Sequence, residues 1–112
     1  MIGIGIDIVE LERFRHASYF DRLCEYILTD AERGMMRASR DAFQFVASRF
    51  AAKEAVMKAF PHRLMYQDIE IAKEGAAPVA RIRHSESGSY RTLVSISHSM
   101  DNVVGMATVE RV

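Results

Sequence analysis

The chain has 112 residues, and 49% of them are hydrophobic, which is enough to build a core. Equal numbers of basic and acidic residues give a formal net charge of zero, so overall charge does not point to nucleic acid or to a membrane surface as a partner. The single cysteine, Cys24, excludes an internal disulfide and fits a reducing compartment. No signal segment or membrane-spanning run is visible. We therefore expect one cytoplasmic domain over residues 1–112.

The first segment, residues 2–8, alternates isoleucine with glycine or aspartate. This period of two predicts a β-strand with one apolar face. The other face carries Gly3, Gly5 and Asp7, and glycines inside a strand indicate that another backbone or a ligand comes close. Asp7 is expected near the end of the strand, beside open surface. The alternative is that Asp7 caps a helix that begins near Val9.

Helical signals occupy the next part of the chain. Residues 9–26 have apolar residues at the spacing of one or two short amphipathic helices. Thr29 and Glu32 have the spacing of a capping box, which predicts another helix start. Residues 41–60 give the strongest signal, because they are rich in alanine and contain no glycine before Pro61 ends the helix. This helix is apolar on two nearly opposite faces, so we expect it to be deeply buried or to pack against another chain as well.

After the long helix the pattern changes to short runs that are rich in β-branched residues and bounded by Gly, Pro, Ser or Asn. It predicts three or four antiparallel strands, within residues 66–72, 79–83, 90–97 and 102–109. Residues 99–102 are typical of a hairpin turn. A strand, several helices, one long buried helix and an antiparallel C-terminal meander together define an α+β domain.

Glu54 falls within an apolar stripe of the long helix, between Phe50 and Met57. A buried carboxylate is costly unless it is paired or binds a metal. The simpler interpretation is an ion pair with Lys58, four residues further on, which contributes only about 0.2 to 0.5 kcal/mol. The other interpretation adds Asp7, because two carboxylates suit Mg²⁺, which takes its remaining ligands from water and substrate phosphates.

Three cations, Arg49, Lys53 and Lys58, lie along the same helix and have the chemistry to bind a polyphosphate, although such residues often only solvate a surface. His98 shares a strand face with apolar residues, where either a core histidine or a functional one is found. No other histidine has ligand spacing with it, so we do not expect zinc. Neither a nucleophile elbow nor a P-loop nor a dinucleotide motif is present.

Three segments, in order, match one family: GIGIDIVELER at the start, SRFAAKEAVMKAF in the middle and VSISHS near the end. Together they resemble the holo-(acyl carrier protein) synthases, the small bacterial class of 4′-phosphopantetheinyl transferases. YILTDAE and YQDIEI extend the resemblance over nearly the whole chain. The combination of the three segments is specific, whereas any one of them alone is not.

The resemblance implies the 4′-phosphopantetheinyl transferase fold and a Mg²⁺-dependent reaction. In that reaction the phosphopantetheine group of coenzyme A is transferred to a serine of an apo acyl carrier protein, and adenosine 3′,5′-bisphosphate is released. It further implies that Asp7 and Glu54 bind the metal, that Lys58 neutralises the diphosphate, and that Arg49, Lys53 and His98 lie near the coenzyme. A water on the metal and Glu54 both remain candidates for the base that takes the serine proton.

The family's small members are homotrimers with active sites between subunits, which would account for the two apolar faces of the long helix. Its carrier-binding surface is a basic helix after the first strand, and the matching residues here are Arg13, Arg15 and Arg22, opposite an acidic helix of the carrier. Carriers of fatty acid biosynthesis and of secondary metabolism are both compatible with the sequence.

Two segments depart from the family pattern. Pro61 stands where glycine usually follows the long helix, and residues 75–78 lack the lysine of the family's G-K-P turn. These departures motivate an alternative function, a family member with weakened catalysis that binds coenzyme A or a carrier protein. A third possibility is a structural oligomer in which Glu54 and Lys58 form only an ion pair.

Overall fold

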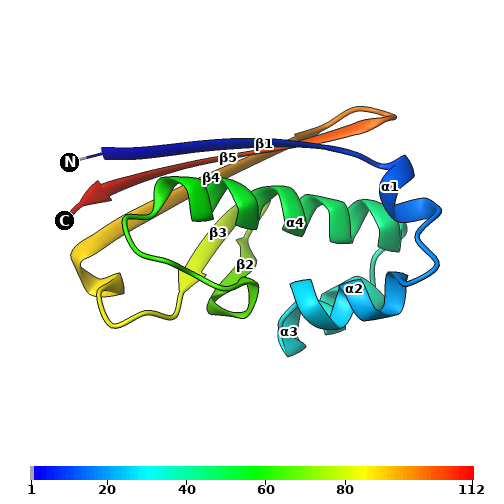
Figure 1. The fold of residues 1–112 in the computed structure, drawn as a ribbon, viewed down its shortest axis with the longest axis horizontal. Coiled ribbons are helices and arrows are strands. Elements are labelled where there is room, and N and C mark those ends of the chain that lie inside the picture. The colour runs from blue at the N-terminus through cyan, green and yellow to red at the C-terminus, as the bar shows by residue number, and fades with distance from the viewer. Residues whose placement is uncertain (1) are drawn as a thin grey trace.

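The computed structural model describes residues 2–112 (Figure 1). Its α-helices are α1 (Glu12–Arg15), α2 (Phe20–Ile27), α3 (Asp30–Arg37) and α4 (Ala42–Ala59), and short 3-10 turns form η1 (Tyr66–Asp68) and η2 (Ser87–Ser89). Its strands are β1 (Ile2–Glu10), β2 (Ile69–Glu74), β3 (Ala77–Ile82), β4 (Tyr90–His98) and β5 (Asn102–Arg111). The predicted N-terminal strand, long helix and mixed α+β architecture are confirmed. None of the helices in the described part of the chain is long and apolar enough to cross a membrane.

The strands form two antiparallel sheets, one of order β1-β5-β4 and one made of β2 and β3. The C-terminal strands are antiparallel as predicted, but they are two hairpins in different sheets rather than one continuous meander. Residues 66–68, expected to begin a strand, form the η1 turn instead. The predicted turn at residues 99–102 is confirmed by a bond of 2.9 Å from the Ser99 amide to the Asn102 carbonyl.

Helix α4 packs directly on the backbones of β1 and β5. A Cβ atom on Gly3 would lie 1.8 Å from the carbonyl oxygen of Ala59, and one on Gly5 would lie 2.0 Å from that of Ala55. No side chain fits in that space, so glycine is required at both positions. The close backbone approach expected from the glycines of the first strand is therefore confirmed, and it brings the Asp7 end of β1 beside α4.

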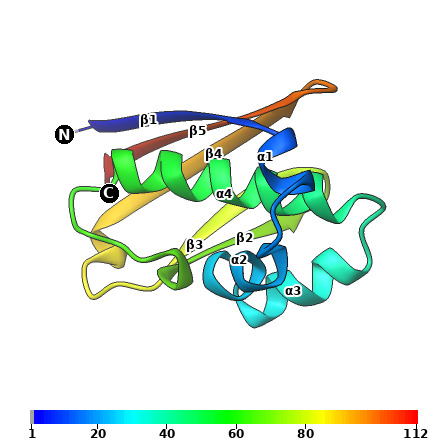
Figure 2. The same cartoon turned by 45° about the vertical axis from the view of Figure 1, so that its right-hand side comes forward.

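The side of α4 that faces away from this sheet is covered by the same chain, by α1 to α3 and by β2 (Figure 2). Val46 belongs to a buried cluster with Ile27 and Leu28, and Val56 belongs to a second cluster with Ile71. Both apolar faces of the helix are thus occupied within one chain. Deep burial, the first of the two expected alternatives, is therefore confirmed, and neither apolar face of the helix needs a second chain to cover it.

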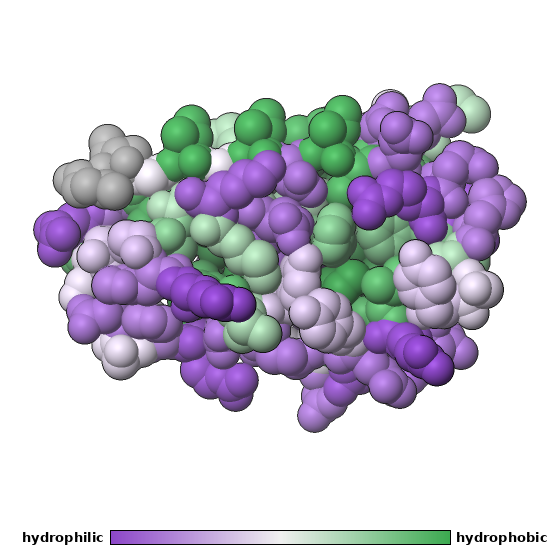
Figure 3. Space-filling model, viewed as in Figure 1, coloured by the Kyte–Doolittle hydropathy of each residue, from purple (hydrophilic) through white to green (hydrophobic). Residues whose placement is uncertain are grey.

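A group of exposed apolar side chains lies on the outer face of the three-stranded sheet. On this face Ile4, Ile6 and Ile8 of β1 are 69%, 61% and 64% exposed, and Leu93 of β4 and Met106 of β5 are 55% and 39% exposed. The strand register places these residues on one face, because Ile6 lies opposite Met106 and Ile4 opposite Thr108, which in turn lies opposite Leu93. Figure 3 shows hydrophobic side chains gathered along the β1 border of the molecule.

Candidate active site

Asp7 lies inside β1 on the face that carries Gly3 and Gly5, which is the face that packs on α4. It caps no helix, since α1 begins at Glu12 with Leu11 at its N-cap position, so that alternative is wrong. The ammonium group of Lys58 lies 3.5 Å from Oδ1 of Asp7 and donates a hydrogen bond of 2.8 Å to the carbonyl oxygen of Ile6.

Lys58 therefore pairs with Asp7 and not with Glu54. Within residues 2–112 there is no ion pair between Glu54 and Lys58, although the two are four residues apart on one helix. The Lys58 side chain is 52% exposed, and only two of its three N–H donors have partners in this part of the chain. It is thus available to an anion from solvent.

The Asp7 and Glu54 carboxylates lie within electrostatic range of each other. Burial raises the pKa of Asp7 above its ordinary value, Lys58 opposes this rise, and the negative charge of Glu54 adds to it. Within the described residues no group of three or more His, Cys, Asp and Glu side chains is arranged as a metal site. Two half-buried carboxylates nevertheless suit a hard divalent cation that takes its other ligands from water and phosphate.

Tyr66 is a residue of this site that sequence reasoning did not single out. Its hydroxyl group, on η1, donates a hydrogen bond to Oε2 of Glu54. Burial and this bond raise the pKa of Tyr66 above its ordinary value, so the phenol keeps its proton at neutral pH. The only signal was the family-like segment YQDIEI that contains it, because no local period connects residues 54 and 66.

Lys53 was expected near the coenzyme, and the structure corrects this. Its side chain is fully buried, and its ammonium group bonds to Glu32 Oε1 at 2.6 Å, to the Ile27 carbonyl at 2.6 Å and to the Tyr66 carbonyl at 3.1 Å. All three donors are used inside the protein, so none is left for a phosphate. Lys53 is a structural residue that joins α4 to α2, α3 and η1.

Arg49 and His98 lie on the other flank of α4 from Asp7. Arg49 is 5% exposed, and its guanidinium stacks on the Phe45 ring at 4.0 Å and donates to the Ile71 carbonyl of β2 at 3.3 Å. His98 ends β4, the sheet edge opposite β1, and its Nδ1 accepts a bond of 2.8 Å from the Gln44 amide. Both residues line one hollow of about 390 Å³, together with the cations Arg40 and Lys73.

The three arginines expected to bind a carrier protein are on two helices rather than one. Arg13 and Arg15 are on α1 and Arg22 is on α2, and all three are exposed. Arg13 is the nearest to the carboxylates, since its charge acts on Asp7 and its guanidinium lies 6.0 Å from the Phe50 ring. Arg15 pairs with Asp41 at 3.5 Å.

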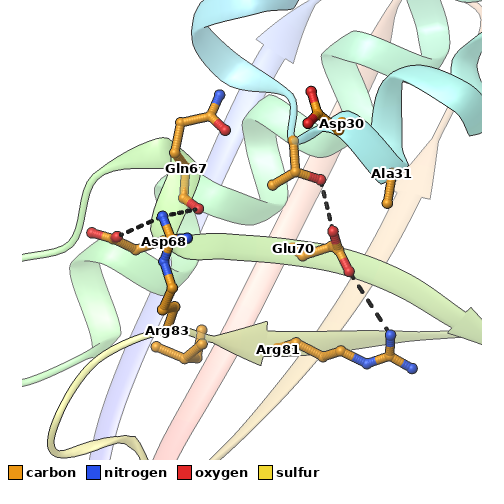
Figure 4. A pocket seen from close by; sticks show the side chains of 9 residues that line it. Asp30, Ala31, Gln67, Asp68, Glu70, Arg81 and Arg83 are labelled. Carbon is orange, nitrogen blue, oxygen red and sulfur yellow. Dashed lines mark hydrogen bonds and ion pairs between the residues drawn. The ribbon is translucent and has the colours of Figure 1, made fainter.

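A separate hollow of about 540 Å³ lies between the start of α3 and the β2-β3 hairpin (Figure 4). Its charges are already paired with each other: Glu70 accepts from the Thr29 hydroxyl at 2.8 Å and lies 3.8 Å from Arg81, and Asp68 lies 3.7 Å from Arg83. It contains none of the carboxylates or cations described above, so it is not part of this site.

Comparison with known proteins identifies the family of the chain. The sequence model of the 4′-phosphopantetheinyl transferase superfamily matches residues 3–107. The chain belongs to this superfamily. Among curated relatives in it, the holo-[acyl-carrier-protein] synthase of Geobacillus kaustophilus is 42% identical, over 99% of this chain and 90% of the relative. The corresponding enzyme of Chlamydia trachomatis serovar D is 34% identical, over 98% of this chain and all of the relative.

Solved structures of transferases in this superfamily have the same fold. The holo-(acyl-carrier-protein) synthase from Bacillus anthracis, in complex with CoA (3′,5′-ADP), superposes with a TM-score of 0.85 at 34% identity, over 98% of this chain and 96% of that one. The enzyme from Helicobacter pylori in complex with coenzyme A gives 0.82 at 26% identity, over 96% and 99% of the two chains. The family predicted from the three sequence segments is therefore confirmed.

Proposed function

We propose that this protein is a Mg²⁺-dependent holo-(acyl carrier protein) synthase. It transfers the 4′-phosphopantetheine group of coenzyme A to a serine of an apo acyl carrier protein and releases adenosine 3′,5′-bisphosphate. The observation that carries the proposal is the convergence of Asp7, Glu54 and Lys58 from β1 and α4 at one half-exposed place. Membership of the superfamily and the names of its relatives support the same reaction.

Asp7 and Glu54 would hold the magnesium ion. The fit rests on their chemistry: both are oxygen ligands, both are partly buried, and the negative charge of Glu54 contributes to the raised pKa of Asp7. Bound there, the ion would neutralise charge on the diphosphate of coenzyme A. The remaining steps depend on groups of the chain itself.

Lys58 would bind the diphosphate. The serine oxygen forms a bond to the phosphorus that carries the pantetheine arm, and the bond from this phosphorus to the bridging oxygen breaks, which leaves adenosine 3′,5′-bisphosphate. Negative charge shifts to the departing phosphate, and a positioned ammonium group stabilises that charge. The serine proton passes to a base, for which Glu54 and a water remain the two candidates.

Arg49 and His98 would contact the part of the coenzyme that is distant from the reacting phosphate. Within one chain, Arg49 and His98 lie across α4 from Asp7. A single copy therefore does not bring these two residues to the same side of the helix as the carboxylate. We infer that a neighbouring copy supplies them, in a homotrimer that buries the apolar outer face of β1, β5 and β4. Sedimentation equilibrium tests this inference, and a monomer at micromolar concentration would contradict it.

Arg13, Arg15 and Arg22 would receive the carrier protein. They are exposed cations on α1 and α2, and Arg13 reaches toward the carboxylate pair, so an acidic helix docked on them would bring its serine to the site. A cytoplasmic location is part of the proposal and is compatible with the single cysteine, Cys24, which is buried.

The experiment that tests the function is mass spectrometry of an apo acyl carrier protein incubated with the protein, coenzyme A and Mg²⁺. We expect the carrier to gain the mass of one phosphopantetheine group. Glu54→Gln should lower the rate by about 10²-fold or more, because it removes a charged metal ligand but keeps the size of the side chain. Binding of coenzyme A without any transfer to several carriers would instead indicate a binding module, and neither binding nor transfer would contradict both functions.

A further inference from the structure

Tyr66 is fixed at both its ring and its backbone. The ring stacks on Phe50 with centroids 5.8 Å apart and an angle of 23°, and it meets the edge of Tyr26 at 5.3 Å. Among residues 2–112 its hydroxyl group has one hydrogen-bond partner, Oε2 of Glu54. A half-buried aromatic ring between two others has few alternative rotamers, so the hydroxyl is presented at a defined position.

The backbone of η1 is held by two further elements. The carbonyl oxygen of Tyr66 accepts a bond of 3.1 Å from Lys53, which the buried Glu32 holds in turn at 2.6 Å. On the other side, the Gln67 side-chain amide donates to carbonyl oxygens at the end of α2, at 2.7 Å for Leu28 and 3.1 Å for Glu25. The buried ion pair and the end of α2 therefore both determine where Tyr66 stands.

Glu54 has no other hydrogen bond within residues 2–112. Its Oε1 atom is thus left for a ligand from outside the chain, while Oε2 is held by the tyrosine. Carboxylates that bind metals are commonly oriented by such an outer hydrogen bond, and loss of the outer partner typically lowers metal affinity or activity by about 10- to 100-fold.

We propose that Tyr66 is a positioning residue, which orients the Glu54 carboxylate for Mg²⁺ through its hydroxyl group and transmits to the site the rigidity of the buried Lys53–Glu32 pair. This inference rests on the proposed function and extends it to a residue outside the metal ligands. The tyrosine contacts neither the metal nor the reacting phosphate. Its effect is to hold one of the two carboxylates in a single orientation before the ion arrives.

The test compares Tyr66→Phe with Tyr26→Phe. Each substitution removes one hydroxyl group and keeps the ring, and the two rings are in contact, but only the Tyr66 hydroxyl bonds to Glu54. Manganese affinity is measured by electron paramagnetic resonance in the presence of coenzyme A and without a carrier protein. We expect affinity to fall about 10-fold in Tyr66→Phe and to stay within about 2-fold in Tyr26→Phe.

A second measurement separates positioning from a structural effect. The transfer rate of Tyr66→Phe should return toward that of the unsubstituted protein as the Mg²⁺ concentration is raised, because weaker metal binding is overcome by mass action. Equal manganese affinities in the unsubstituted protein and Tyr66→Phe would overturn the inference and leave the proposed function intact. So would a loss of rate that excess Mg²⁺ does not restore. No manganese binding by the unsubstituted protein would overturn both.

Discussion

Lys53 and Lys58 are five residues apart on α4, in the same segment KEAVMK, yet they lie in opposite environments. Lys53 faces the helices and is fully buried, with three acceptors within 3.1 Å. Lys58 lies on the flank beside β1, is 52% exposed and has a loose contact with Asp7 at 3.5 Å. The position of each lysine around the helix therefore determines its role. Lys53 is a buried structural charge, whereas Lys58 is exposed and accessible to a substrate.

The two flanks also differ in how their carboxylates are used. Glu32 is fully buried and accepts hydrogen bonds from the Thr29 and Ile71 amides as well as from Lys53. Burial lowers the pKa of Lys53, and the charge of Glu32 opposes that change. A buried pair of this kind is satisfied on every side. Within residues 2–112, Lys58, Tyr66 and the distant Arg13 are the groups that act on the Asp7 and Glu54 carboxylates, and this weaker compensation is compatible with the proposed cation site.

The largest effect that separates the two lysines is on stability. Lys53→Met should lower the free energy of unfolding by about 3–5 kcal/mol, because it leaves the Glu32 carboxylate buried without its cation. Lys58→Met, the same change at an exposed position, should cost less than about 1 kcal/mol. Urea unfolding followed by circular dichroism measures both. Similar losses of unfolding free energy in the two variants would contradict the distinction between a structural and an exposed lysine.

The second effect is on catalysis, and here the substitution of Lys58 is the one expected to have the large effect. Lys58→Met should lower the rate of carrier modification by about 10²–10³-fold, since in the proposed reaction it removes one positioned charge that stabilises the departing phosphate. Arg37→Met is the control, because Arg37 is an exposed cation at the end of α3, away from the carboxylates. A rate for Lys58→Met that matches the control would show that the contact with Asp7 is only an incidental ion pair.

Local sequence patterns predicted the parts of this comparison that depend on local structure. The isoleucine alternation of β1, the Thr29–Glu32 capping box and the alanine-rich helix α4 are confirmed, because each depends on residues a few positions apart. The role of Lys53 was predicted wrongly, because its three acceptors belong to residues 27, 32 and 66. Tyr66 was missed for the same reason. A helix wheel shows where a side chain points, but not which distant segment meets it.

Asp7 lies beside α4 because the helix packs against the glycines of β1. Substitution of one of these glycines should give the smallest of the three predicted effects. Gly5→Ala places a Cβ atom 2.0 Å from the Ala55 carbonyl, so β1 or α4 must move, at a cost of about 1–3 kcal/mol in the free energy of unfolding.

Gly34→Ala is the matched control for that change. A Cβ atom at Gly34 meets nothing within 4 Å, and because the residue is inside α3 the alanine should stabilise the protein by about 0.5–1 kcal/mol. The shift forced by Gly5→Ala also changes the separation of Asp7 from Glu54, so metal affinity should fall in this variant and not in the control. If Gly5→Ala loses stability but binds manganese normally, the two carboxylates tolerate movement of their backbones, and the fixed orientation of Glu54 matters less than the charge it carries.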